Sequence, residues 1–271
     1  MPRAGRAGAS RAGAARSARL AELYDLDLEE APGDLELYLA LARREGGPIL
    51  ELAAGSGRLA VPLAAAGYRV TAVDVDPAML FRAAAAWEAA RTATGLSAGS
   101  LELVEGDLLT TDLGAGFGMA LLALNSLLLL ETRARQAAAV AALARHLRPG
   151  GLAVIDVWLP GVEDLAGYDG RLGLEWVRAE RDGRRTAKSA SARYDPATAS
   201  VELTTWFDSW PAHGGPLERI ERQDRLRLVG ADELVELAEG AGLRPEQLGG
   251  DHGLSPFGPG AERLVLLGRL V

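Results

Sequence analysis

The sequence has 271 residues, 48% apolar and 24% charged, which is typical of a globular protein with one large domain or a core and an insertion. It has no cysteine, which excludes disulfides, cysteine zinc sites and a thiol nucleophile. Its three histidines show no metal-ligand spacing, so we expect no metal. The net charge of -8 argues against nucleic acid as a partner.

The first part of the chain, residues 1–19, is an Ala/Arg/Gly-rich leader without large apolar side chains. Such a segment buries too little surface to order itself, so we expect it to be disordered. It contains no secretory apolar region, and the most apolar run, residues 119–130, is too short to span a bilayer. We therefore predict a cytoplasmic protein with no membrane partner.

From residue 34 to about residue 158, helix-like stretches alternate with short apolar strands. Asp34 is a natural N-cap for the first of these helices, and Asp76 is one for a later helix that begins at Pro77. Apolar strands separated by helices indicate a parallel sheet covered on both faces, which predicts an α/β fold. The predicted strands are 48–52, 68–74, 100–107, 118–125 and 151–159, and the predicted helices are 34–45, 57–67, 76–91 and 131–147.

After the fifth predicted strand, the pattern becomes antiparallel. Asp182-Gly183 is a strong hairpin signal, residues 194–198 form a second turn, and residues 201–207 alternate between two faces. We therefore predict an antiparallel β insert. The predicted domains are the leader 1–19, the core 20–160, the insert 161–230 and the closing segment 231–271, with a helix over 231–243 and a strand over 262–271.

The stretch ELAAGSGRLA, residues 51–60, joins the first strand of this core to its helix through a glycine turn. Such a turn lets a ligand approach the backbone, with helix N–H groups facing it. The stretch also matches a dinucleotide pattern, with Asp74 placed to hold ribose hydroxyls. Glu51 would repel a pyrophosphate, whereas it would attract the ammonium and sulfonium groups of S-adenosylmethionine. The sequence therefore favours S-adenosylmethionine, with an NAD(P)-dependent oxidoreductase as the alternative.

Four stretches resemble, in order, the motifs of class I S-adenosylmethionine-dependent methyltransferases: ELAAGSG, VTAVDVDPAML, VEGDLL and LALNSLL. The resemblance covers roughly residues 20–160 and the final helix and strands. It implies a Rossmann-like, mostly parallel seven-stranded sheet with helices on both faces and an antiparallel last strand. It also implies a cofactor site: Glu51 at the ammonium, Ala53, Gly55 and Gly57 along the methionine part, Asp74 at the ribose, Val75 on adenine, Asp107 and the Leu108 amide at the adenine edge, and Asn125 near the sulfonium.

Three features depart from the family pattern. Ala53 stands where the first glycine is common, Gly118 where relatives often have an acid, and Leu127–Leu130 where some relatives place a histidine. A protein that binds the cofactor without turnover is therefore a second alternative.

For the acceptor we expect a small molecule. An amine need only arrive neutral, whereas a hydroxyl usually needs a general base, so N-methylation is favoured over O- or C-methylation.

Two residues are catalytic candidates. Tyr24 resembles the N-terminal tyrosine that caps the cofactor in relatives, with core packing as its alternative role. His252 lies in a Gly/Pro-rich loop before the last strand, with a solvated loop position as its alternative. Trp158 and Asp251 are candidate substrate residues. The insert forms part of the substrate cavity in relatives, and a homodimer interface is its alternative role.

Overall fold

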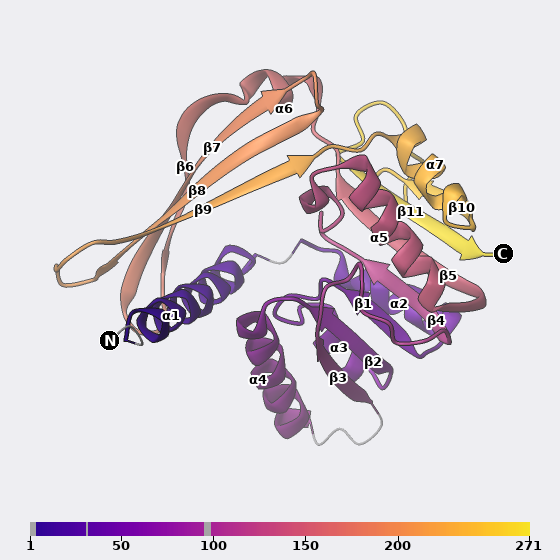
Figure 1. Ribbon diagram of the computed structural model, residues 1–271, viewed down its shortest axis with the longest axis horizontal. Coiled ribbons are helices and arrows are strands. Elements are labelled where there is room, and N and C mark those ends of the chain that lie inside the picture. The colour runs from indigo at the N-terminus through magenta and orange to yellow at the C-terminus, as the bar shows by residue number, and fades with distance from the viewer. Residues whose placement is uncertain (1–3, 31, 95–98) are drawn as a thin grey trace. The chain divides into compact units, whose positions relative to one another are not determined.

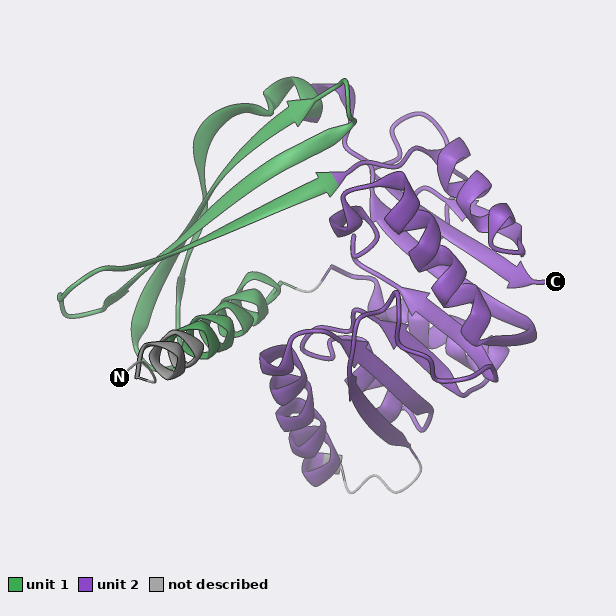
Figure 2. Ribbon diagram, in the orientation of Figure 1, with its two compact units in different colours: residues 1–31, 165–226 green, residues 32–164, 227–271 purple. Residues whose placement is uncertain are grey.

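The computed structural model describes residues 4–30, 32–94 and 99–271. The chain forms two compact units, which Figure 2 shows in different colours. Unit 1 comprises residues 1–31 and 165–226, and unit 2 comprises residues 32–164 and 227–271. Residues 20–31 were predicted to belong to the core. The structure places them in unit 1, with the antiparallel sheet.

Unit 1 is a four-stranded antiparallel sheet, in the order β6-β7-β8-β9, together with helix α1 (Figure 1). The end of the helix is tied to the sheet at Asp27, whose carboxylate accepts from Trp176 Nε1 at 2.8 Å and from Lys188 Nζ at 2.7 Å. Arg19 makes a bidentate pair with Glu180 at 2.6 Å. The elements are α1 (Ala4–Asp27), β6 (Asp169–Ala179), β7 (Arg184–Asp195), β8 (Ser200–Pro211) and β9 (Glu218–Arg227).

Helix α1 shows that the predicted disorder of the leader is wrong for residues 4–19, while residues 1–3 lie outside the described residues. Alanine and arginine are strong helix formers, and this preference prevails where the composition had suggested a disordered segment. Beyond Arg19 the helix also buries Ala21 and Leu23. The sheet that anchors it lies about 150 residues later in the chain, which a local pattern does not reveal.

Unit 2 is built on a seven-stranded sheet with the order β10-β11-β5-β4-β1-β2-β3. Strands β1 to β5 run parallel to one another, and β11 is antiparallel to both β5 and β10. This topology confirms the predicted α/β, Rossmann-like fold with an antiparallel last strand. The strands are β1 (Ile49–Leu52), β2 (Arg69–Asp74), β3 (Ser100–Glu105), β4 (Phe117–Leu122), β5 (Leu147–Trp158), β10 (Leu243–Gly249) and β11 (Arg263–Leu270).

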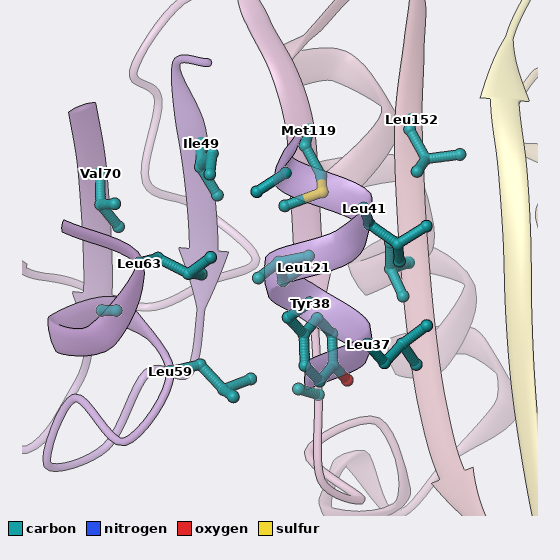
Figure 3. Close-up of a cluster of buried hydrophobic side chains, with 14 of the residues drawn as sticks. Leu37, Tyr38, Leu41, Ile49, Leu59, Leu63, Val70, Met119, Leu121 and Leu152 are labelled. Carbon is teal, nitrogen blue, oxygen red and sulfur yellow. The ribbon is translucent and has the colours of Figure 1, made fainter. Parts of the chain in front are cut away.

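Helices cover both faces of this sheet. On one face α2, α3 and α4 pack around a core that includes Tyr38, Ile49 and Met119 (Figure 3), and α5 and α7 cover the other face. Among the described residues, no helix is long and apolar enough to cross a membrane. The helices are α2 (Leu35–Glu45), α3 (Ala60–Ala65), α4 (Pro77–Thr94), α5 (Arg133–His146), α6 (Val162–Gly167), α7 (Ala231–Gly240) and the 3-10 helix η1 (Leu128–Leu130).

The two predicted N-caps behave differently. Asp76 Oδ1 accepts from the Ala78 amide at 2.9 Å, which confirms this cap. Asp34 occupies the N-cap position of α2 but makes no side-chain cap bond. Its carboxylate pairs with Arg58 at 2.5 and 2.7 Å instead, because a charged guanidinium is a stronger partner than a backbone amide.

Candidate cofactor and acceptor site

The carboxyl ends of the parallel strands meet at one edge of the unit 2 sheet, where open α/β sheets form their ligand crevice. Glu51 lies in β1, Asp74 ends β2 and Asn125 follows β4, so three predicted cofactor residues share this edge. Strand β10 ends and β11 begins at the same edge, because β11 runs antiparallel to β5. The loop that carries His252 therefore belongs to this edge too.

The glycine turn after β1 has a left-handed backbone at three of its positions. Gly55 has φ 57°, Gly57 has φ 81° and Ala53 has φ 56°. A Cβ on Gly57 would lie only 3.0 Å from both the Ala83 and Val61 side chains, so glycine is needed there for space as well as conformation. Ala53 adopts a conformation that favours glycine, and it stands where the family usually has one.

Asp74 ties the end of β2 to this turn. Its Oδ2 accepts from the Gly55 amide at 2.7 Å and its Oδ1 accepts from the Asp76 amide at 2.9 Å. A carboxylate can accept about four hydrogen bonds, so these two leave capacity for ribose hydroxyls. The same side chain that shapes the loop is thus able to hold a ligand.

Glu51 is a buried acid with an incomplete set of partners. Its Oε2 is buried and has no hydrogen-bond partner among the described residues. Burial raises the pKa of Glu51 to about 8, although the charge of Arg58 and a hydrogen bond from the Ala60 backbone act in the opposite direction. The negative charges of Asp34 and Asp74 add to the increase. A cationic ligand would lower the pKa of Glu51 again, because a nearby positive charge favours the ionised carboxylate.

Glu51, Asp34, Arg58 and Tyr38 form a polar cluster that extends into the core. Asp34 is fully buried against Arg58, which therefore serves more than one carboxylate. The Tyr38 hydroxyl is buried and has no hydrogen-bond partner in the part of the chain that the structure describes. Burial together with the charges of Asp156, Asp34 and Glu51 raises its pKa well above the ordinary value. The cluster has an excess of acids over bases.

On the side predicted for adenine, the residues are accessible. Val75, which follows β2, is 69% exposed and so is accessible to a ligand. Asp107 is exposed after β3 and accepts from the Leu109 amide at 2.8 Å, while its neighbour Leu108 is half-buried. The exposed Val75 could pack against a flat heterocycle, and the Asp107 carboxylate and Leu108 amide could form hydrogen bonds with its edge.

Asn125 links the ends of β4, β5 and β11. Its backbone is left-handed with φ 68°, a conformation that asparagine tolerates better than most residues. Its Oδ1 accepts from the Trp158 amide at 2.6 Å and from Arg263 Nη2 at 3.3 Å, and its amide donates to the Asp156 carbonyl at 3.1 Å. The half-buried Trp158 is thereby held at the crevice edge.

His252 has a carboxylate partner, which comes from β5. Its Nε2 lies 3.3 Å from Asp156 Oδ2, while the exposed Asp251 accepts from the Ser255 amide at 3.0 Å and shapes the loop. Neither Asp156 nor its second partner Arg263 was predicted from the sequence. The available signal was an acid within the apolar run AVIDVW, because a buried carboxylate requires a partner.

The remaining predicted residues lie elsewhere. Tyr24 is half-buried in α1 of unit 1, and its predicted role rests on the sequence resemblance. Gly118 lies at the amino end of β4, where a Cβ would face the Arg148 guanidinium at 3.4 Å, so this departure is at the edge opposite the crevice. In Leu127–Leu130, all but Leu129 are buried, so this segment serves packing.

One cluster among the described residues has metal-ligand chemistry. Ligand atoms of Asp34, Asp156 and His252 lie within 4.8 Å of one another. Both carboxylates are already paired with guanidinium groups, Asp34 with Arg58 and Asp156 with Arg263. A divalent cation would therefore face two arginines at close range, and we interpret the cluster as a network of ion pairs.

Known proteins resemble parts of this chain in sequence. Residues 49–151 match the family model for a methyltransferase domain. The cypemycin N-terminal methyltransferase of Streptomyces sp is 32% identical over 127 residues, which cover 47% of this chain and 48% of that protein. The dTDP-3-amino-3,4,6-trideoxy-alpha-D-glucopyranose N,N-dimethyltransferase of Streptomyces venezuelae is 34% identical over 158 residues, covering 57% and 62%. The chain thus spans about half to three-fifths of the length of these relatives.

The fold is shared more widely. The solved structure of an S-adenosylmethionine-dependent methyltransferase from Clostridium acetobutylicum superimposes with a TM-score of 0.74 at 16% identity, covering 93% of this chain and 98% of that one. At this identity the likeness concerns the fold alone. Together with the family match over residues 49–151, it confirms the predicted fold and the resemblance to class I methyltransferases.

Proposed function

We propose that this chain, whose residues 49–151 match the family model for a methyltransferase domain, moves a methyl group from S-adenosylmethionine to a small-molecule amine. The observation that carries the proposal is Glu51, a buried acid whose Oε2 has no partner among the described residues. With Asp34 and Asp74 adding negative charge around it, this position suits the ammonium of a ligand that is also a sulfonium.

The cofactor would be held by residues at the crevice edge, and when bound it supplies an electrophilic methyl group. Glu51 would pair with its ammonium, the Asp74 carboxylate would accept from its ribose hydroxyls, and the exposed Val75 would pack on its adenine. Asp107 and the Leu108 amide would read the adenine edge. The turn through Ala53, Gly55 and Gly57 would follow the methionine part, and the backbone at Asn125 would lie near the sulfonium.

On the acceptor side, His252 is the proposed base. When bound, S-adenosylmethionine would supply its methyl group to a neutral amine nitrogen, with the electron pair of the broken carbon–sulfur bond left on sulfur. That nitrogen would give up a proton to His252 as the new carbon–nitrogen bond forms, so the base would act in the step that sets the rate. Trp158 would line the acceptor position and Asp251 would attract an amine, while Tyr24 keeps its predicted role as a cap on the cofactor.

An amine is the favoured acceptor for two reasons. A neutral amine needs little activation, so much of the rate can come from placement and exclusion of water. One of the two similar Streptomyces proteins is also named as an N,N-dimethyltransferase of an amino sugar, and the other as an N-terminal methyltransferase. Oxygen and carbon acceptors are the alternatives.

The proposal extends to the location of the enzyme, its partner and the role of unit 1. We propose a cytoplasmic enzyme whose partner is a small molecule, because the net charge of -8 disfavours a phosphate backbone. The antiparallel sheet of unit 1 would contribute a wall or lid of the acceptor pocket, with a homodimer interface as its alternative role.

A panel of acceptors tests the proposed activity. The purified protein is incubated with S-adenosylmethionine and either the dTDP-linked 3-amino sugar named for the Streptomyces venezuelae relative, a peptide with a free N-terminus, or a hydroxylated compound of similar size. A mass increase of one methyl group on an amine supports the proposal. Cofactor binding without methylation of any compound would favour a non-catalytic protein.

One substitution tests the proposed base in this assay. The change His252→Ala should lower turnover by about 10²-fold while cofactor affinity stays nearly intact, because general base catalysis is worth that order of magnitude. Full activity in this variant would remove His252 from the mechanism.

A further inference from the structure

Asp156 is a buried acid that no part of the proposed reaction yet uses. It lies in β5, two residues before the strand ends at the crevice edge, and its side chain is fully buried. Burying a carboxylate is costly unless several partners compensate. The partners of Asp156 therefore indicate what holds it there.

The two carboxylate oxygens have different partners. Oδ1 accepts from Arg263 Nε at 2.8 Å and from Arg263 Nη2 at 2.7 Å. Oδ2 faces His252 Nε2 at 3.3 Å and the Leu124 amide at 3.4 Å. Burial alone would raise the pKa of Asp156, but the hydrogen bond with His252 and the charge of Arg263 outweigh it and lower the pKa. The carboxylate is therefore ionised at neutral pH.

An ionised carboxylate fixes the protonation pattern of the imidazole beside it. A carboxylate only accepts hydrogen bonds, so Nε2 must be the nitrogen that carries the proton in a neutral His252 ring. The other nitrogen, Nδ1, then holds a lone pair. It has no hydrogen-bond partner among the described residues and is not one of their buried unpartnered atoms, so it can reach a ligand at the crevice.

Arg263 connects this pair to the cofactor side. Its Nη2 also donates to Asn125 Oδ1, which in turn accepts from the Trp158 amide. Asn125, Arg263, Asp156 and His252 thus form one chain of polar contacts along the ends of β4, β5 and β11. A guanidinium on Oδ1 directs Oδ2 to His252 and balances its charge.

We propose that Asp156 is a positioning residue, which holds the ring of His252 with Nε2 as the donor and leaves Nδ1 to accept the proton that the amine nitrogen releases. This inference rests on the proposed N-methyl transfer for its catalytic consequence. The orientation of the ring itself can be tested without any acceptor.

The substitution Asp156→Asn gives a specific expectation. Arg263 has only donors to offer, so it retains the amide oxygen, and the amide nitrogen takes the position opposite His252. This nitrogen would donate to Nε2, which moves the proton of the neutral ring to Nδ1. The lone pair would then point away from the acceptor.

Nitrogen-15 NMR on histidine-labelled protein reads this directly, since the chain has three histidines. The signals of His252 are those that vanish in His252→Ala. His146 is an internal reference of the opposite kind, because its Nε2 accepts from the Leu113 amide at 3.2 Å and its Nδ1 contacts the Ala142 carbonyl at 2.7 Å.

We expect the Nε2–H form for His252 in the unmodified protein and the Nδ1–H form in Asp156→Asn, with His146 unchanged. An Nδ1–H form of His252 in the unmodified protein would overturn the inference, even if the variant fails to fold. An unchanged His252 tautomer in a folded variant would overturn it as well.

The second test measures kcat with the amine of the panel that the unmodified protein methylates fastest. Asp156→Asn should lower kcat by about 10²-fold with the affinity for S-adenosylhomocysteine unchanged. The matched control is Glu246→Gln, whose carboxylate also pairs with an arginine of β11, Arg269, and which should leave both kcat and the tautomer unchanged. Full kcat in Asp156→Asn would refute the catalytic consequence. If the unmodified protein methylates no amine, the proposed function fails and the NMR arm alone decides the inference.

Discussion

The buried acid at the end of β1 makes the affinity for the cofactor depend on pH. Burial raises the pKa of Glu51 to about 8, so in the free protein this carboxyl carries a proton at neutral pH. A ligand ammonium pairs with the ionised form, and binding must therefore release a proton. Affinity should rise with pH, because less work is needed to remove that proton as the pH approaches 8.

The size of the effect follows from the distance between the pH and this pKa. Well below pH 8 each pH unit changes the ionised fraction about tenfold, which corresponds to about 1.4 kcal/mol. We therefore expect cofactor affinity to increase about tenfold between about pH 6 and about pH 7, and to level off near pH 8.

Calorimetric titration with S-adenosylhomocysteine at these pH values measures the slope. Two buffers of different ionisation enthalpy would report the release of close to one proton per ligand. Glu51→Gln should remove the slope, because the neutral amide does not titrate. The matched control Glu45→Gln should keep it, since Arg269 holds the pKa of that carboxyl at about 2. A flat affinity in the unmodified protein would show that Glu51 does not titrate against the ligand.

Three further predictions concern single side chains. Asp74→Ala should cost about 1.5–3 kcal/mol of cofactor binding by calorimetry, the range for hydrogen bonds to a charged group, and unchanged affinity would disprove the ribose assignment. Ala53→Gly should raise the free energy of unfolding by about 1 kcal/mol in urea titrations, because Ala53 has a φ of 56°, and a loss of stability would contradict this strain. Burial lowers the pKa of His146, so the stability it contributes is present above about pH 6.5 and is lost as the pH falls. His146→Gln should flatten the fall in unfolding free energy between about pH 7.5 and 5, and an unchanged slope would argue against it.

The sequence was sufficient for the parts of the fold that depend on local pattern. Apolar strands between helices predicted the parallel sheet, and the alternation in residues 201–207 matches a strand that buries Val201, Thr205 and Phe207 on one face. The glycine turn and the two acids at the ends of β1 and β2 also lie where the motif spacing placed them. Periodicity and turn chemistry act over a few residues, so they can be read from the chain.

The features that sequence analysis missed depend on residues far apart in the chain. Asp156 meets His252 and Arg263 only because β11 pairs with β5, a register that no local pattern encodes. Asp34 fits a capping pattern, but the fold brings a guanidinium to it. Composition predicted a disordered leader because the sheet that anchors α1 lies in a distant segment.

The central claim is that the acid-rich end of β1 selects a cationic cofactor without phosphates. Calorimetric titration of the purified protein with S-adenosylmethionine, S-adenosylhomocysteine and NADH in parallel, at about pH 8 where Glu51 is half ionised, tests it most directly. We predict binding of the first two and no binding of NADH. Preference for NADH, or no binding of any of the three, would contradict the assignment of Glu51 and of the glycine turn beside it.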